Sequence, residues 1–327
     1  MIIRPTRQAA LRAPVRWSTP ARLVQCLTER DRWILRMCHE HRVLTTPQLA
    51  ALGFASQNLA RRRLAALHRY LVLDRFRPLR EVGSAPAHWV LAPAGAAVLA
   101  AEAGVEVKDL GYRSDRALAV AHSLHLAHTL GTNEWFTALA TDIGGTPAGT
   151  LLAWWSEARC RALWGDLARP DGYARYTRDR ACLDFFLEYD LGTMALSTVA
   201  AKLHGYADLA RSSAVITPVL LWLPTVAREA AARQKLHEVW TGLPDPGAVP
   251  VATAAAELLD PAAASPATRV WLPLDPAATG GRVELHRLPA AWPHVPAPPS
   301  TVPDPPTSRH AILTPPPPRP PSETGTR

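Results

Sequence analysis

Three carboxylates and a lysine have the residue types and the spacing that phosphoryl chemistry needs. Glu188 and Asp190 lie two residues apart in the stretch FFLEYDLGT, residues 185–193, whose apolar beginning is typical of a buried strand. Side chains two apart on a strand point to the same face, so we expect these two acids to lie together. Asp171, in RPDG, stands at the head of the preceding predicted strand, and Lys202 follows on a predicted helix.

Acids at the ends of adjacent strands predict a site for a divalent cation. Mg²⁺ is held by one or two carboxylates together with water and substrate phosphate, and Mn²⁺ takes the same ligands. We expect the cation at Asp171, Glu188 and Asp190, where it would activate water and stabilise charge on a phosphoryl group. Lys202 would add an ammonium beside the cluster. The alternative interpretation is structural: the acids cap strands or pair with nearby arginines, namely Arg169, Arg175 and Arg178.

The elements that must position these residues follow an α/β pattern. Over residues 117–240 the periodicity predicts helix, strand, strand, strand, helix, strand and helix, and therefore a mixed sheet. The first strand is expected over TLLAWWSEARC, residues 150–160, and the long helix before it is expected to break near Gly131. A strand pair is expected around TRVWLPL, residues 268–274, and GRVELHRL, residues 281–288.

The first hundred residues follow a different pattern, in which three predicted helices precede two strands. Thr28 with Asp31, Thr45 or Thr46 with Pro47, and Ser56 supply start signals for the three helices. LVLDRFRPL and HWVLAP then alternate as strands around a turn at residues 80–87, and a helix closes at Gly104. This is the order of a winged helix-turn-helix, with the third helix as the recognition helix and residues 80–87 as the wing.

Basic residues concentrate in the same part of the chain. The net charge is +8; residues 1–116 hold 19 Lys/Arg and 9 Asp/Glu, a balance of +10, and the remainder holds 17 and 19, a balance of −2. This asymmetry favours a polyanion partner, which we expect to be double-stranded DNA. The alternative is a solvated helix used for protein contacts. Arginine binds phosphates and reads guanine edges, so the expected DNA-binding residues are Asn58, Arg61, Arg62, Arg63, Arg69, Arg75 and Arg80.

The sequence also indicates the compartment. The four cysteines (Cys26, Cys38, Cys160 and Cys182) have no metal-ligand spacing, which fits a reducing environment. The N-terminus has no apolar signal region, and no stretch of eighteen apolar residues occurs. We therefore expect a cytoplasmic protein that does not contact a membrane.

The order of the motifs resembles a known family. RPDG, FFLEYDLGT and KLHGY are similar to the core of the PD-(D/E)xK nuclease superfamily. With the winged-helix pattern and LAHTLGTNEWFTAL, residues 126–139, the chain resembles the replication-relaxation family of actinobacterial plasmids and mobile elements. The resemblance, over about residues 25–240, implies a multidomain α+β protein: an N-terminal winged helix-turn-helix followed by a restriction-endonuclease-like α/β domain with a mixed central sheet.

The resemblance also implies a function, whereas composition and element order predict the boundaries of the parts. The function would be plasmid replication and relaxation of plasmid DNA by a metal-dependent DNA nickase or nuclease, with other replication or mobilisation proteins as further partners. The expected boundaries are a basic flexible arm at 1–20, the winged helix at 21–116, the nuclease-like domain at 117–288 and a Pro-rich disordered tail at 289–327.

By position, Asp171 matches the first acid of the family motif and Glu188 the second. The family places a lysine two residues after the second acid, where this chain has Asp190. Two interpretations stay open: Lys202 replaces that lysine from the following helix, or the site is degenerate. A further acid would come from Glu134 or Glu157. The alternatives to catalysis are a replication accessory protein and a transcriptional regulator that uses only the winged helix.

Overall fold

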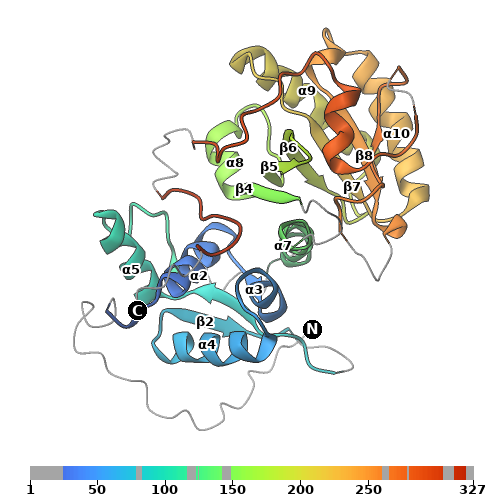
Figure 1. The fold of residues 1–327 in the computed structure, drawn as a ribbon. Helices are drawn as coiled ribbons and strands as arrows, with labels where there is room; N and C mark the ends of the chain where they lie inside the picture. Colours follow the sequence, from blue (N-terminus) through green and yellow to red (C-terminus); the bar gives the residue numbers. More distant parts are fainter. Residues whose placement is uncertain are drawn as a thin grey trace. The chain divides into compact units, whose positions relative to one another are not determined.

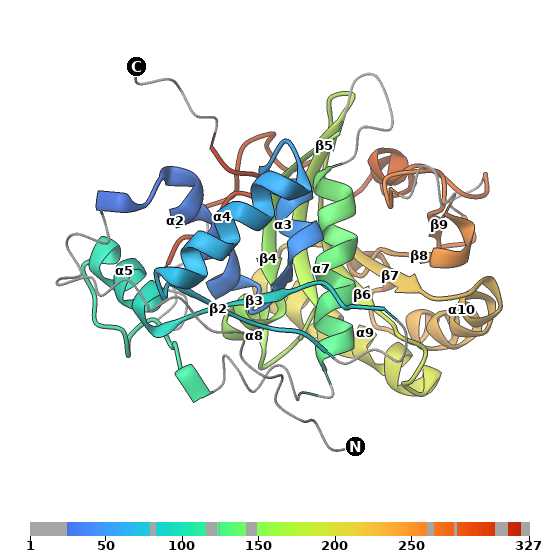
Figure 2. The same cartoon turned by 90° about the horizontal axis from the view of Figure 1, so that it is seen from below.

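The computed structural model describes residues 25–78, 83–115, 123, 125–141, 149–259, 265–277, 280–304 and 313–321. The chain divides into two compact units (Figure 1), residues 1–133 with 309–327, and residues 134–308. The division falls within α7, Leu126–Ala140, which is drawn end-on in Figure 1 and lengthwise in Figure 2. The domain boundaries expected from the sequence remain a prediction.

The N-terminal unit begins with three capped helices, α2 (Glu29–Glu40), α3 (Thr46–Gly53) and α4 (Gln57–Arg69). Thr28 and Asp31 form a reciprocal capping box at α2, and Thr45 forms one with Gln48 at α3. The Ser56 hydroxyl accepts a hydrogen bond from the backbone N–H of Leu59 at the start of α4. These side chains satisfy backbone donors that a helix start leaves unpaired, and the predicted start signals are confirmed.

A short antiparallel sheet completes this unit, with the order β1-β3-β2. Its strands are β1 (Leu44–Thr45), β2 (Leu73–Phe76) and β3 (His88–Leu91), and α5 (Pro93–Ala103) follows. Gly104 ends α5 at a φ of 67°, a conformation that favours glycine. β1 was not predicted, because two residues carry no periodicity. The remaining elements have the predicted order, and their assignment as a winged helix stays a prediction.

The second unit is built on a six-stranded mixed sheet with the order β4-β5-β6-β7-β8-β9. β4, β5 and β6 pair antiparallel, β7 and β8 continue parallel to β6, and β9 is antiparallel to β8. The predicted mixed sheet and α+β class are confirmed. The strands are β4 (Thr150–Ser156), β5 (Gly172–Arg178), β6 (Ala181–Tyr189), β7 (Val219–Leu223), β8 (Val251–Ala255) and β9 (Leu272–Pro273).

Helices α9 (Leu196–Ser213) and α10 (Val226–Thr241) pack their apolar residues on one face of this sheet. Phe186 of β6 belongs to that buried cluster, together with Leu203 of α9. Phe185 points to the opposite face, where the centre of its ring lies 6.0 Å from the centre of the Trp135 ring. Because strand side chains alternate, Glu188 shares the face of Phe186 and points toward α9.

Several sequence-based predictions for this unit were wrong in detail. The strand expected over 150–160 ends at Ser156, whose hydroxyl caps a helix, α8 (Glu157–Trp164). α7 runs through Gly131 without a break. Of the expected late strand pair, residues 272–273 form β9, which pairs with β8. Trp271 and Val283 form an isolated bridge, and residues 285–291 form a 3-10 helix, η4 (Leu285–Ala291). β8 was missed altogether.

The structure describes residues 289–304 and 313–321 of the region expected to be a disordered tail. Arg175 of β5 pairs with Asp184 through two contacts of 2.6 Å, and its Nη1 donates to the backbone oxygens of Pro299 and Thr301 at 3.3 and 3.0 Å. Residues 299–301 are thereby held against β5. Among the described residues, no helix has the length and apolar character needed to cross a membrane.

Candidate active site and nucleic-acid interface

Glu188 is the centre of a buried polar cluster at the end of β6. It is only 5 % exposed. Its Oε2 lies 2.5 Å from Nζ of Lys202, and its Oε1 accepts a hydrogen bond from the hydroxyl of Tyr206. Lys202 and Tyr206 are four residues apart on α9, so one helix face delivers both side chains to the strand end. The structure thus brings Glu188 and Lys202 together, as the sequence predicted.

Asp171 lies beside Glu188 because the ends of their strands meet. It immediately precedes β5, whose first residue, Gly172, pairs with Leu187 of β6. The backbone N–H of Asp171 donates to the Leu187 oxygen at 2.9 Å, and its carboxylate Oδ2 accepts from the backbone N–H of Tyr189 at 2.7 Å. This arrangement fixes the carboxylate at the mouth of the β5–β6 pair.

Proton affinities are strongly shifted in this cluster. Burial, and then repulsion by Asp171, raise the pKa of Glu188 to about 7 although Lys202 and Tyr206 act in the opposite direction. Burial lowers the pKa of Lys202, but attraction by Glu188 and Asp171 outweighs it and the net shift is upward. Burial, followed by the charge of Glu188, raises the pKa of Tyr206 well above its usual value. Lys202 and Tyr206 therefore keep their protons at neutral pH and donate hydrogen bonds to Glu188, and clusters with shifted pKa values are typical of functional sites.

Asp190 has a different set of partners. Its carboxylate is bound by Nε and Nη2 of Arg228 on α10, with 3.1 Å between Nη2 and Oδ1. Nη2 of Arg228 also donates to the backbone oxygen of Met194 at 2.6 Å. The two acids of FFLEYDLGT therefore have different partners: residues of α9 bind Glu188, and Arg228 of α10 binds Asp190.

The residues present fit a cation held by two carboxylates. Within the part of the chain that the structure describes, no group of three or more Asp, Glu, His or Cys side chains is placed to hold a metal ion. Asp171 and Glu188 lie close enough for their charges to interact, and Mg²⁺ needs no more than one or two carboxylates beside water and phosphate. Of the two further acids considered, Glu157 helps raise the pKa of Lys202 from the first turn of α8.

Glu134, the other further acid, lies near a different side chain. Burial, and secondarily the charge of Glu134, raise the pKa of Tyr189. Glu134 therefore stands on the Tyr189 side of β6, whereas Glu188 points to the face of α9.

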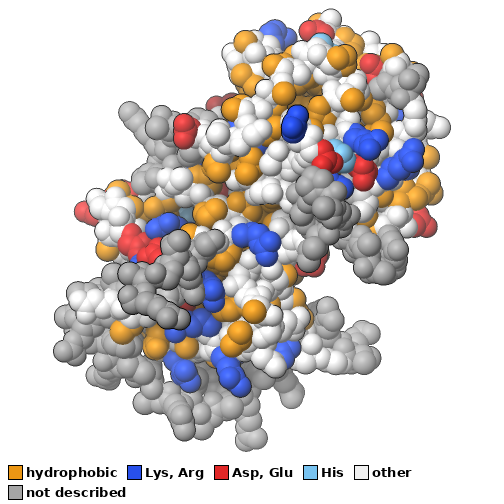
Figure 3. Space-filling model, in the orientation of Figure 1, with side chains coloured by type: hydrophobic (Ala, Val, Ile, Leu, Met, Phe, Trp, Pro, Cys, Tyr) orange, Lys and Arg blue, Asp and Glu red, His pale blue; other side chains and the backbone are white. Residues whose placement is uncertain are grey.

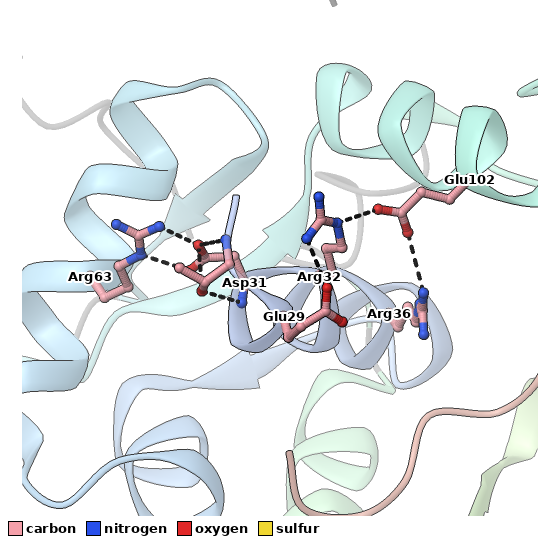
Figure 4. A network of polar contacts seen from close by, with 7 residues as sticks. Glu29, Asp31, Arg32, Arg36, Arg63 and Glu102 are labelled. Carbon is pink, nitrogen blue, oxygen red and sulfur yellow. Dashed lines mark hydrogen bonds and ion pairs between the residues drawn. The ribbon is translucent and has the colours of Figure 1, made fainter. Parts of the chain in front are cut away.

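On the basic helix α4, one arginine is committed to packing within the unit. Nε of Arg63 donates to Oδ1 of Asp31 at 2.7 Å, and its Nη2 contacts Oδ2 (Figure 4). Asp31 is completely buried and also accepts hydrogen bonds from the backbone N–H and hydroxyl of Thr28 at 2.7 and 2.9 Å. This ion pair fastens α4 to α2.

The other predicted DNA-binding residues that the structure describes are exposed: Asn58, Arg61, Arg62, Arg69 and Arg75. Arg61 donates to the Gln57 side chain at 3.3 Å, and the Arg75 guanidinium lies 5.8 Å from the Trp89 ring centre. Lys and Arg side chains gather over the region where α4 lies (Figure 3). Arg80 is outside the described residues. A solvent-facing basic surface therefore remains on α4 beside the Arg63 contact.

A family model described as replication-relaxation matches residues 35–219, which is more than half of the chain. The chain belongs to the replication-relaxation family. The match runs from α2 to the first residue of β7 and includes α4 and the whole Glu188 cluster. Comparison with characterised proteins and with solved structures gave no significant match. Membership of the family indicates a role in the replication and relaxation of plasmid DNA.

In this replication-relaxation protein, sequence reasoning missed two functional neighbours. Tyr206 could have been found, because it stands four residues after Lys202 on the same predicted helix. Arg228 carried no such signal, since it lies 38 residues from Asp190 on another helix. The interpretation that acids pair with arginines holds for Asp190, although its partner is none of the three arginines named from the sequence.

Proposed function

We propose that this protein binds double-stranded DNA through a winged helix in its N-terminal unit and nicks DNA at a PD-(D/E)xK-like site around Glu188. The observation that carries the proposal is the buried Glu188 carboxyl, which contacts Lys202 and Tyr206 and whose pKa burial and the neighbouring Asp171 raise to about 7. A carboxyl group with a pKa near 7, beside a second acid and a lysine, has the composition of a site that hydrolyses phosphodiesters.

Each residue of the cluster has a role in this proposal. Asp171 and Glu188 would hold Mg²⁺ or Mn²⁺, which supplies Lewis acidity to the phosphate and lowers the pKa of a bound water. Lys202 would direct its positive charge at the phosphate oxygens and orient the attacking water. Tyr206 fixes the Glu188 carboxylate through its hydroxyl. The water oxygen would form a bond to phosphorus and give up a proton to the solvent, while the bond from phosphorus to the ester oxygen breaks and that oxygen takes up a proton from the solvent.

A plasmid-relaxation assay tests the proposal. We expect supercoiled plasmid to become open circle with Mg²⁺ or Mn²⁺, and to remain supercoiled with EDTA or with the Asp171→Asn variant. If plasmid is shifted in a gel but never nicked under any of these conditions, the protein acts by binding, as an accessory protein would.

Cation binding should depend on pH through Glu188. Its raised pKa means that the free protein keeps a proton there up to about pH 7, and the cation needs the carboxylate. We therefore expect the affinity for Mn²⁺ to rise about tenfold per pH unit below pH 7 and to level off above it. Titration calorimetry at pH 6 in buffers of different ionisation enthalpy should show close to one proton released.

The control for that titration is Glu188→Gln, which removes the titrating group and keeps its shape. Its residual Mn²⁺ binding should lose both the pH dependence and the proton release. Equal proton release from wild type and Glu188→Gln would assign the titration to another group.

DNA binding should depend on the exposed arginines of α4. Each phosphate contact contributes about 0.9 to the slope of log K against log salt. We expect the double variant Arg62→Ala/Arg69→Ala to reduce that slope by about 2 and to weaken binding at low salt. Fluorescence anisotropy with duplex DNA across a salt series measures both. Arg113→Ala, at an exposed arginine paired with Asp115, is the control and should leave the slope unchanged.

A further inference from the structure

The segment 313–321, LTPPPPRPP, lies against the N-terminal unit although it is the last part of the chain that the structure describes. Nε1 of Trp33 on α2 donates a hydrogen bond to the backbone oxygen of Pro317 at 2.8 Å. In Figures 1 and 2 the segment runs beside α2. The contact is directional, because an indole N–H selects a carbonyl and does not merely cover apolar surface.

The proline rings of the segment have two distinct environments. Pro316 and Pro318 are buried, whereas Pro317 and Arg319 are exposed. Four consecutive prolines fix φ near −65° and favour the polyproline II conformation, which has no internal hydrogen bonds. The segment therefore presents buried rings and an available carbonyl with little conformational entropy left to lose.

A glycine shapes the receiving surface. A Cβ at Gly53, the last residue of α3, would lie 2.9 Å from Cζ3 of Trp33 and 3.5 Å from Cγ of Pro320. The absence of a side chain lets the indole and the proline ring approach α3. Trp33 is 2 % exposed with the segment in place. An aromatic ring with an N–H donor beside a small residue is the kind of surface that receives Pro-rich segments.

We propose that Trp33 and Gly53 form a polyproline-recognition site whose ligand is the chain's own C-terminal segment, residues 313–321. The site is specific for an extended run of prolines with one carbonyl facing the indole. It uses α2 and the end of α3, and none of the exposed arginines assigned to DNA. Segment binding at this site is therefore independent of DNA binding and of nicking.

A labelled peptide tests the assignment. Fluorescein-LTPPPPRPP is titrated with the full chain and with a full-length variant whose four prolines 315–318 are replaced by alanine. The wild-type segment competes from within the same molecule at high effective concentration. We therefore expect the variant to bind the peptide at least about tenfold more tightly than the wild type does. The peptide LTAAAARAA, with the same length and charge, should not bind.

The receiving residue is tested in the same background. Trp33→Phe keeps an aromatic ring and removes the N–H donor, which should weaken peptide binding about fivefold, the worth of one hydrogen bond. Gly53→Ala is a second variant that perturbs the site from α3, should Trp33→Phe fail to fold. Circular dichroism confirms that each variant is folded before titration.

Three results would overturn the proposal. Equal peptide binding by wild type and the four-alanine variant would show that the segment does not occupy the site. Binding of LTAAAARAA as tight as that of the proline peptide would show that no polyproline selectivity exists. A wild-type dimer in light scattering that the free proline peptide converts to monomer would place a second copy's segment at Trp33 and contradict the intramolecular assignment.

Discussion

Replacing Lys202 with alanine is expected to slow metal-dependent nicking of plasmid by about a hundredfold to a thousandfold, the usual loss when one pre-oriented charge donor is removed. DNA affinity should fall by no more than the loss of one phosphate contact, because the exposed arginines of α4 remain. The substitution also takes away the positive charge that opposes the upward shift of the Glu188 pKa. Part of the loss at pH 7 should therefore reflect protonation of Glu188.

A pH series separates these two effects. At pH 8.5 Glu188 is ionised more fully, so the loss that persists there belongs to Lys202 itself. Lys235→Ala is the matched control, because Lys235 is 51 % exposed on α10 and pairs only locally with Glu238 at 2.8 Å; it should nick like wild type. A Lys202→Ala protein with full activity at pH 8.5 would reduce Lys202 to a structural counter-charge for Glu188.

Arg63→Ala is expected to destabilise the protein by about 3 kcal/mol, near the lower end of the range for breaking a buried ion pair. Asp31 is completely buried, so its carboxylate would lose its charged partner, and because Arg63 is 31 % exposed, water would replace the guanidinium only in part. The cost should not reach the upper end, because Thr28 still donates two hydrogen bonds to the same carboxylate. Urea unfolding followed by circular dichroism measures the free energy.

Arg62→Ala is the matched neighbour for that experiment. Arg62 is exposed on the same helix, so its loss should change the free energy of unfolding by no more than about 0.5 kcal/mol. Substitutions of the two adjacent arginines should therefore have different effects: the loss of Arg63 lowers mainly stability, and the loss of Arg62 lowers mainly DNA affinity. Equal stability of both variants would contradict the structural role given to the Arg63–Asp31 pair.

Local signals made much of the fold predictable. Thr28, Thr45 and Ser56 mark helix starts through contacts with residues three positions away, and such contacts can be read directly from sequence. β8, Val251–Ala255, could not be read in this way. All five residues are buried and three of them are alanine, so the segment shows no alternation of polar and apolar residues and is rich in a residue that strands disfavour. The helix α8 was hidden because Ser156 ends one element and caps the next.

In the candidate site, too, some residues could be predicted from the sequence and others could not. Asp171, Glu188 and Lys202 were accessible from motif order, and Tyr206 from the helical period. The ion pairs Arg63–Asp31 and Arg228–Asp190 were not accessible, because they join residues 32 and 38 positions apart. Sequence reasoning therefore placed Arg63 with the DNA-binding arginines and Asp190 with the cation ligands, whereas the structure shows each in an ion pair between elements.

The residues of the Glu188 cluster all come from one continuous stretch of the chain, residues 171–206. This matters while the chain is being synthesised. Lys202 and Tyr206 are separated from Glu188 by only 14 and 18 positions, so closing these loops costs little chain entropy. Every group that neutralises or caps the buried carboxylate has been synthesised once the chain reaches residue 206. Because chains emerge from the ribosome in order, the charge on Glu188 need not wait unpaired for β8, β9 or the C-terminal prolines. Nascent chains that end shortly after α9 should already contain all the partners of this costly side chain.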